Sequence, residues 1–158
     1  SGPRHVAFAP SGKLMYVLNE LTSTITAFEL DAENGSTKEI QSLSALPPDF
    51  SGANTTAEIT IDAQGKFLYA SNRGDNSIGI YSIDSQSGKL TPVEWMPSGG
   101  KDPRHFEIDP TGQWLFAANQ NSDNIVLFRI DPKSGKLTRT TELSDIKSPV
   151  CVRFMPLM

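Results

Sequence analysis

Short apolar runs separated by polar turns recur along the chain. Residues 61–83 read IDAQGKFLYASNRGDNSIGIYSI, where the apolar runs Phe67–Ala70 and Ile78–Tyr81 flank a polar stretch at residues 72–77. Apolar runs of this length, bounded by residues that favour turns, predict two strands of a hairpin rather than a helix.

The same pattern occurs at residues 8–30 and again at residues 108–130. The spacings between equivalent glycines are 53 and 47 residues. A period of roughly 40–50 residues built from short strands is typical of a β-propeller blade. The equivalent glycines are Gly12, Gly65 and Gly112.

Each repeat divides into four predicted strands, which lie at residues 5–9, 14–19, 24–30 and 38–43 in the first repeat. The second strand is almost wholly apolar in every repeat, which indicates that both of its faces are covered by neighbouring blades. The fourth strand is polar, as an outer edge strand should be. No apolar pattern of helical period and length is present, so we expect an all-β protein.

Recurrent polar residues are best explained as parts of turns. Asn34-Gly35 predicts a tight hairpin between the third and fourth strands. Asparagines that end the second strand are expected to have a turn role, since their side chains can bond the backbone and tolerate left-handed geometry. Aspartates that follow the third strand are expected to be turn residues as well. These residues are Asn19, Asn72 and Asn119, and Asp31, Asp84 and Asp131.

The expected fold is a β-propeller fragment of about three four-stranded antiparallel blades plus the inner strand of a further blade. The blades are expected at about residues 4–46, 56–98 and 103–145, and the closing strand at 149–154. Propellers typically close with roughly 4–8 blades, so 158 residues are not expected to close a ring alone. The first repeat is longer by 6 residues, and the excess falls at residues 47–54.

Charge and cysteine content exclude several classes of function. The net charge is −4 and no cluster of Lys or Arg occurs, so no nucleic-acid partner is expected. No apolar run reaches the roughly 18 residues of a membrane span, so no membrane partner is expected. The single cysteine, Cys151, is expected to be a small buried residue, and the lack of an internal disulfide favours a cytoplasmic location.

Candidate functional residues are those that differ at equivalent positions of the repeat. The start of the first strand and the end of the second strand should lie at the same end of each blade, and the first strand should line the central channel. The variable residues should therefore surround one mouth of the channel, together with the insertion at 47–54. They are Arg4, His5, Glu20, Glu58, Arg73, Arg104 and His105.

Imidazoles, carboxylates and guanidiniums in one concave place predict an acid–base and anion-binding site. Two plainer interpretations stay open: Glu20 and Arg73 pair with each other or with solvent, and His5 and His105 bond backbone across the channel. No closely spaced ligand motif predicts a metal site, and no phosphate-binding loop or nucleophile motif occurs. Neither a metal nor a cofactor is therefore expected.

Several segments together resemble the lactonase family of seven-bladed β-propellers, which includes cycloisomerase-type 6-phosphogluconolactonases and 3-carboxymuconate cyclases. The resemblance covers essentially the whole chain and suggests the C-terminal portion of a longer ring. The segments that carry it are GPRHVAFAPSGK, YVLNE, TAEITIDAQGKFLYASNRG, PRHFEIDPTGQWLFAANQNSDNIVLFRID and SPVCVRF.

The resemblance implies a hydrolase that opens a sugar lactone, typically 6-phosphoglucono-1,5-lactone of the pentose phosphate pathway. By position, the family's catalytic roles fall on His5, Glu58 and Arg73, with Arg104 as a further candidate. Either Glu58 or His5 would be the base that activates water, and Arg73 and Arg104 would hold a phosphate or carboxylate. Arg4, Glu20, Arg104 and His105 are expected to bind the substrate.

Two other functions stay open from the sequence. One is carboxymuconate lactonisation, an isomerase reaction, at the same site. The other is a propeller without catalysis that serves as an interaction scaffold. The expected partner is a small lactone or sugar phosphate, and a homo-oligomer could cover apolar surface such as Leu14–Leu18 on an open blade. Whether three blades suffice for activity is left open.

Overall fold

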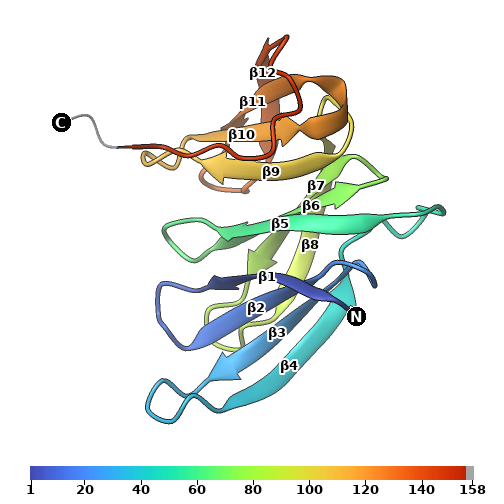
Figure 1. Cartoon of the computed structure of the whole chain (residues 1–158). Helices are drawn as coiled ribbons and strands as arrows, with labels where there is room; N and C mark the ends of the chain where they lie inside the picture. Colours follow the sequence, from blue (N-terminus) through green and yellow to red (C-terminus); the bar gives the residue numbers. More distant parts are fainter. Residues whose placement is uncertain (156–158) are drawn as a thin grey trace.

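The structure is a computed structural model that describes residues 1–155. It contains three four-stranded antiparallel sheets stacked face to face, each with its strands in sequence order (Figure 1). The first strands of neighbouring sheets lie side by side. The strands are β1 (Pro3–Phe8), β2 (Leu14–Asn19), β3 (Thr24–Leu30), β4 (Thr37–Ser44), β5 (Thr55–Ile61), β6 (Phe67–Arg73), β7 (Ser77–Ile83), β8 (Leu90–Pro97), β9 (Pro103–Ile108), β10 (Trp114–Asn119), β11 (Asn124–Ile130) and β12 (Leu137–Leu143), with a short 3₁₀ turn η1 (Gln120–Ser122) after β10.

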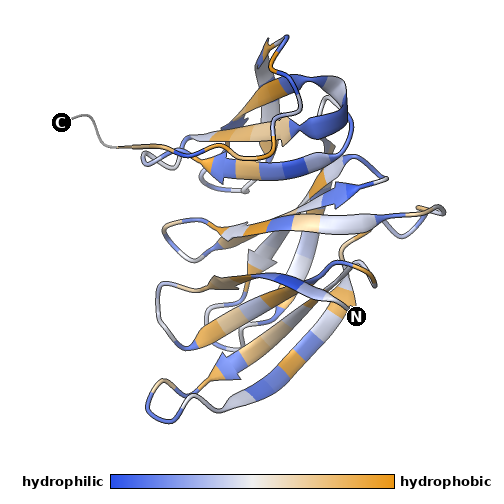
Figure 2. Ribbon diagram, viewed as in Figure 1, coloured by the Kyte–Doolittle hydropathy of each residue, from blue (hydrophilic) through white to orange (hydrophobic). Residues whose placement is uncertain are grey.

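The expected all-β fold is confirmed. Sheets span residues 3–44, 55–97 and 103–143, where blades were expected at 4–46, 56–98 and 103–145. Strand β1 begins two residues earlier than predicted, because Pro3 pairs with Asn19 across a β-bulge. Figure 2 shows apolar residues on the strands of each sheet and an alternation of apolar and hydrophilic residues along the outer strand β4.

Burial of the second strand depends on the position of its sheet in the stack. Strand β6 of the middle sheet is buried from Phe67 to Asn72, as the continuous apolar run predicts. Strands β2 and β10 alternate between buried and half-buried residues, because only one face of each outer sheet has a neighbour. Strand β12 is exposed beyond its first residue, which agrees with its prediction as an outer edge.

Each pair of neighbouring sheets is joined by a buried tyrosine. The Tyr16 hydroxyl donates a hydrogen bond to the Gly88 carbonyl in the second sheet, at 3.0 Å. The Tyr69 hydroxyl does the same to Gly135 in the third sheet, at 2.9 Å. A Cβ atom on Gly135 would approach the Phe67 ring to 2.5 Å, so only glycine lets this loop dock. The loops between third and fourth strands thus lock adjacent sheets together.

The hairpin that Asn34-Gly35 predicts is confirmed by the antiparallel pairing of β3 with β4, but its loop is longer than a two-residue turn. The Asp31 N–H bonds the Ser36 carbonyl and leaves four residues between them. Only the glycine has positive φ, whereas a two-residue type I′ turn needs positive φ at both central positions. The turn role of the aspartates is confirmed, because Asp31, Asp84 and Asp131 accept hydrogen bonds from loop N–H groups.

The recurrent asparagines also differ from the predicted turn role, because they lie within β2, β6 and β10 and none of them is left-handed. Each pairs in the sheet ladder, which requires an extended backbone. Two of their buried side chains bond backbone carbonyls of other segments. Asn72 donates to the Ala45 carbonyl at 2.9 Å, and Asn119 donates to the Ser98 carbonyl at 3.1 Å. Left-handed residues occur four positions further on, at Ser23, Asn76 and Asp123.

Residues 149–154 run beside β9 without forming a strand. The described residues offer them no second strand to pair with, so the predicted inner strand of a further blade stays a prediction. The expectation that Cys151 is buried is wrong, because this segment lies on an open face and leaves the thiol exposed. Phe154 packs edge-on against Phe116, with ring centroids 5.1 Å apart.

Among residues 1–155 the structure has no helix with the length and apolar character that a membrane span requires.

Replacing Tyr69 with phenylalanine should lower the free energy of unfolding by about 1–3 kcal/mol, because the buried Gly135 carbonyl loses its donor. Tyr16→Phe should cost a similar amount at the other junction. Urea unfolding followed by circular dichroism measures both. Unchanged midpoints and slopes in both variants would show that these hydroxyls do not join the sheets.

Candidate functional site

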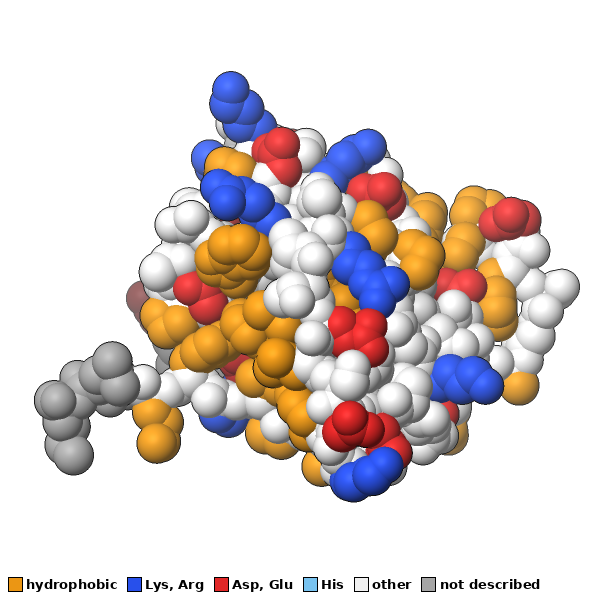
Figure 3. Space-filling model, turned by 90° about the horizontal axis from the view of Figure 1, so that it is seen from above, with side chains coloured by type: hydrophobic (Ala, Val, Ile, Leu, Met, Phe, Trp, Pro, Cys, Tyr) orange, Lys and Arg blue, Asp and Glu red, His pale blue; other side chains and the backbone are white. Residues whose placement is uncertain are grey.

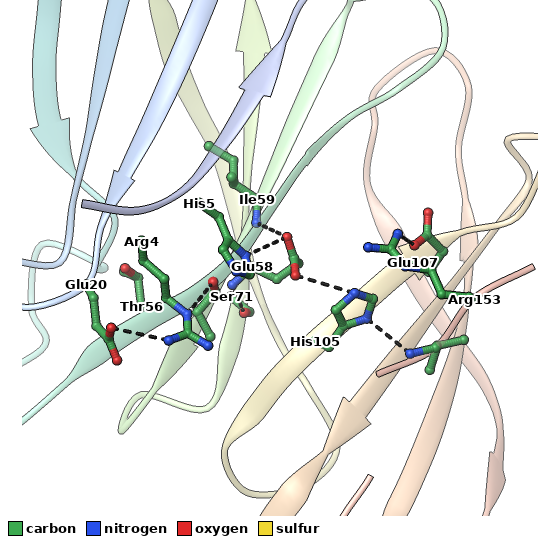
Figure 4. Close-up of polar contacts among 12 residues, drawn as sticks. Arg4, His5, Glu20, Thr56, Glu58, Ile59, Ser71, His105, Glu107 and Arg153 are labelled. Atoms are coloured by element: carbon green, nitrogen blue, oxygen red, sulfur yellow. Dashed lines mark hydrogen bonds and ion pairs between the residues drawn. The ribbon is translucent and has the colours of Figure 1, made fainter. Parts of the chain in front are cut away.

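Three of the predicted site residues form one line of polar contacts, called the polar chain, across the stack. His5, Glu58 and His105 occupy equivalent positions on β1, β5 and β9 (Figure 4). His5 Nδ1 lies 3.0 Å from Glu58 Oε1, and His105 Nε2 lies 3.4 Å from Glu58 Oε2. Because the inner strands lie side by side, residues one repeat apart become direct neighbours.

Glu58 is the buried centre of this chain, with only 9% of its surface exposed. Its Oε1 atom also accepts the Ile59 N–H at 3.1 Å, and its own N–H donates to Ser71 Oγ at 3.0 Å. A buried carboxylate is stable only when its oxygens have such partners. Glu58 is therefore held in one orientation by the strands on both sides of it.

His105 has a defined tautomer. The Val152 N–H donates to its Nδ1 at 3.3 Å, so Nδ1 is unprotonated and the proton of the neutral ring is on Nε2, facing Glu58. Burial lowers the pKa of His105, and the Arg153 guanidinium adds to this, although Glu58 acts in the opposite direction. The neutral ring is thus the favoured form, with its Nε2 atom 3.4 Å from the carboxylate.

His5 has the opposite arrangement. Since a carboxylate only accepts hydrogen bonds, His5 Nδ1 carries a proton and donates it to Glu58. Within residues 1–155 no hydrogen bond uses its Nε2 atom, and 40% of its side chain is exposed. A neutral His5 therefore presents an unprotonated Nε2 to solvent.

Arg4 and Arg73 bind the same carboxylate. Arg4 contacts Glu20 at 3.3 Å and the Ala57 carbonyl at 3.0 Å, and Arg73 bonds Glu20 and the Thr56 carbonyl. Burial acts to raise the pKa of Glu20, but hydrogen bonds and charge from Arg73 and Arg4 outweigh it and lower this pKa. This agrees with the plainer interpretation in which Glu20 and Arg73 pair with each other.

A hollow of about 610 Å³ lies next to this chain. Arg104 does not line it and instead contacts Gln120 at 3.5 Å. The insertion does not line it either, because Pro47, Pro48 and Phe50 face a separate hollow with Trp95. Residues that line the hollow are Pro3, Arg4, His5, Val6, Val17, Glu58 and Arg153.

Arg153 is the residue that the sequence reasoning missed. It is equivalent to Ala7, Thr60 and Glu107 in the alignment of repeats, a further position where the residue type varies. Comparison restricted to the start of the first strand overlooked this position. The same comparison extended two residues along the strand would have identified it.

Among the described residues, no group of three or more His, Cys, Asp or Glu side chains is arranged so that it could hold a metal ion. His5 and His105 each contact Glu58, which lies between them.

Fold and site together define a β-propeller with a polar cluster where its inner strands meet. Residues 1–154 match the model of a family described as lactonase, 7-bladed beta-propeller, so the chain belongs to this family. A 6-phosphogluconolactonase of Bacillus subtilis is 39% identical over 106 residues, which cover 67% of this chain and 30% of the relative.

Solved structures of similar proteins agree with this family assignment. A periplasmic gluconolactonase of Pseudomonas aeruginosa superposes with a TM-score of 0.92 at 34% identity and covers 99% of this chain and 43% of that protein. A Lactobacillus plantarum protein reaches a TM-score of 0.94, also at 34% identity, over 98% of this chain and 45% of its own. The chain thus spans less than half the length of these relatives.

The buried histidine should make stability depend on pH. Because burial lowers the pKa of His105 below its ordinary 6.5, the unfolded chain binds this proton more readily than the folded chain. The free energy of unfolding should therefore decrease as the pH falls below about 6.5. Urea unfolding between pH 7.5 and pH 5 (roughly the range in which histidine titrates) measures this slope.

The matched variant is His105→Gln, whose side-chain amide can still donate to Glu58 but does not titrate. It should show a smaller slope over the same range. A variant slope equal to that of the unsubstituted chain would mean that another group causes the dependence.

Proposed function

We propose that the protein hydrolyses the ester bond of a sugar lactone bound in the hollow, with His5 as the general base. The observation that carries this proposal is the 3.0 Å contact between His5 Nδ1 and Glu58 Oε1. It orients the imidazole so that its unprotonated Nε2 is left to accept a proton from water. A carboxylate that orients a histidine in this way is a recurrent arrangement in acyl-transfer sites.

In the first step, His5 Nε2 takes a proton from a water molecule as the water oxygen attacks the lactone carbonyl. The resulting tetrahedral intermediate carries a negative charge on the former carbonyl oxygen. When it collapses, the ring C–O bond breaks, and the imidazolium returns its proton to the departing ring oxygen. Lactone and water are thereby converted to one hydroxy acid, and His5 is regenerated.

Two neighbouring residues support these steps. Glu58 is a positioning residue, because its Oε1 atom accepts hydrogen bonds from His5 and the Ile59 N–H and it acts through His5. Arg4 lines the same hollow, where its positive charge would stabilise the developing oxyanion. Arg73 contributes indirectly, through the Glu20 carboxylate that it shares with Arg4.

The substrate class follows from the names of the relatives. One is called a 6-phosphogluconolactonase and another a gluconolactonase, so a six-carbon aldonolactone is the common substrate. We favour 6-phosphoglucono-1,5-lactone, which would place the reaction in the pentose phosphate pathway. The named activities give no support to the carboxymuconate isomerase alternative.

A cytoplasmic location stays a prediction, because one solved relative is a periplasmic gluconolactonase.

Replacing His5 with asparagine should reduce kcat/KM for lactone hydrolysis by about 10²–10⁴-fold, the usual contribution of a general base. The asparagine amide can still donate to Glu58, so the variant removes Nε2 while keeping the contact. Initial rates above spontaneous hydrolysis are measured by titrating the acid released.

Glu58→Gln should also lower kcat, because it weakens the orientation of His5. Arg139→Gln serves as a control, since Arg139 pairs with Glu142 on the exposed β12. Unchanged kcat/KM in both His5→Asn and Glu58→Gln would remove these residues from the reaction. Absence of any lactonase activity in the unsubstituted chain would favour a non-catalytic scaffold.

We also propose that a second copy of the chain covers the open sheet faces. Tyr16 and Leu18 of the predicted Leu14–Leu18 surface are buried, but Phe8 on the first sheet is 54% exposed. Figure 3, which views the third sheet from outside, shows apolar side chains gathered there. Leu143 on β12 and Val150 in the segment that follows it are exposed. Apolar faces of this kind favour association.

Light scattering should therefore give a mass above the 17.2 kDa of one chain. Phe8→Ser should shift the distribution toward the single chain, because it places a polar side chain on the open face. A single species at 17.2 kDa for the unsubstituted chain at high concentration would contradict the proposal.

A further inference from the structure

The segment after β12 is attached to the site by successive residues. Val152 donates its N–H to His105 Nδ1 at 3.3 Å. Arg153, the next residue, forms an ion pair with Glu107, two residues beyond His105 on β9 (Figure 4). Phe154 then packs on Phe116, as described above. These contacts fix the place of the Arg153 side chain although the segment belongs to no sheet.

Arg153 lines the same hollow as His5 and Glu58. It comes from the third sheet's side of the stack, whereas His5 comes from the first. Its side chain is 68% exposed, so most of the guanidinium faces solvent. A ligand whose reacting carbonyl lies at His5 could therefore extend toward Arg153.

The other guanidiniums are less available. Arg4 bonds both Glu20 and the Ala57 carbonyl, and Arg73 bonds Glu20 and the Thr56 carbonyl. Arg104 is outside the lining of the hollow. Among residues 1–155, Arg153 has one carboxylate partner, contacted through Nη1, and a guanidinium carries five N–H donors. Donors are thus left for a second anion.

We propose that Arg153 is a substrate-binding residue that takes the anionic substituent of the lactone, at the end of the substrate remote from the reacting carbonyl. This inference rests on the proposed lactonase function and deepens it. The substituent is an oxyanion, either a phosphate or a second carboxylate, because a planar guanidinium binds both in a bidentate way. Glu107 positions the guanidinium by holding one of its nitrogens.

Binding of three six-carbon acids tests the proposal without turnover. 6-Phosphogluconate, glucarate and gluconate share a carboxylate at C1 and carry a phosphate, a carboxylate and a hydroxyl at C6. Calorimetry with the unsubstituted chain should show tighter binding of one or both of the acids charged at C6 than of gluconate. The preferred acid identifies whether the substituent is a phosphate or a carboxylate.

Arg153→Gln should abolish this preference by weakening the charged ligand about 10- to 100-fold, the usual effect of losing a charge-assisted hydrogen bond. Gluconate binding should change little. Arg153→Lys keeps the charge but not the fork of donors, and should recover part of the preference. Arg139→Gln, an exposed arginine outside the hollow, is the control.

The outcomes separate this proposal from the proposed function. If the chain hydrolyses lactones but Arg153→Gln keeps the preference, or if no acid charged at C6 is preferred, Arg153 has no role in anion binding. If the chain shows Arg153-dependent binding without hydrolysis, the anion site stands and the lactonase proposal is overturned. Circular dichroism of each variant establishes that it is folded.

Discussion

Packing of one sheet face against the next is the interaction on which this structure depends. The middle sheet has a neighbour on both sides, and its second strand is buried along most of its length. Tyr16 and Tyr69 add a directional hydrogen bond at each junction, which fixes how the sheets are aligned. That alignment brings equivalent positions of the inner strands within hydrogen-bonding distance. The polar contacts of the site therefore depend on how the sheets are stacked.

Most of the fold could be predicted from the sequence, because the repeated pattern of apolar runs and polar turns indicates the strands of each sheet. The continuous apolar run at Phe67–Ala70 indicated two covered faces, and the polar fourth strands indicated the outer edge. Errors arose where a local signal had more than one solution. Asn34-Gly35 fits a two-residue turn. The chain instead reverses direction through a four-residue loop after Asp31, in which one glycine is left-handed.

The site was predictable in part. Alignment of repeats places His5, Glu58 and His105 together, because that conclusion needs only the stacking of equivalent positions. It does not reveal which nitrogen of each ring carries a proton, since that depends on Val152 and on the two Glu58 oxygens. Nor does it show that Glu20 neutralises Arg73, because one carboxylate can serve any of several nearby guanidiniums.

The Val152 N–H donates a hydrogen bond to the His105 ring, so the contact between the terminal segment and β9 depends on the charge of that ring. A doubly protonated imidazole has donors at both nitrogens, so it would face the Val152 N–H as a second donor and repel it. The amide proton of Val152 is consequently a spectroscopic indicator of the ring. Its chemical shift and its exchange with solvent would report, from the backbone, whether the segment is engaged or released.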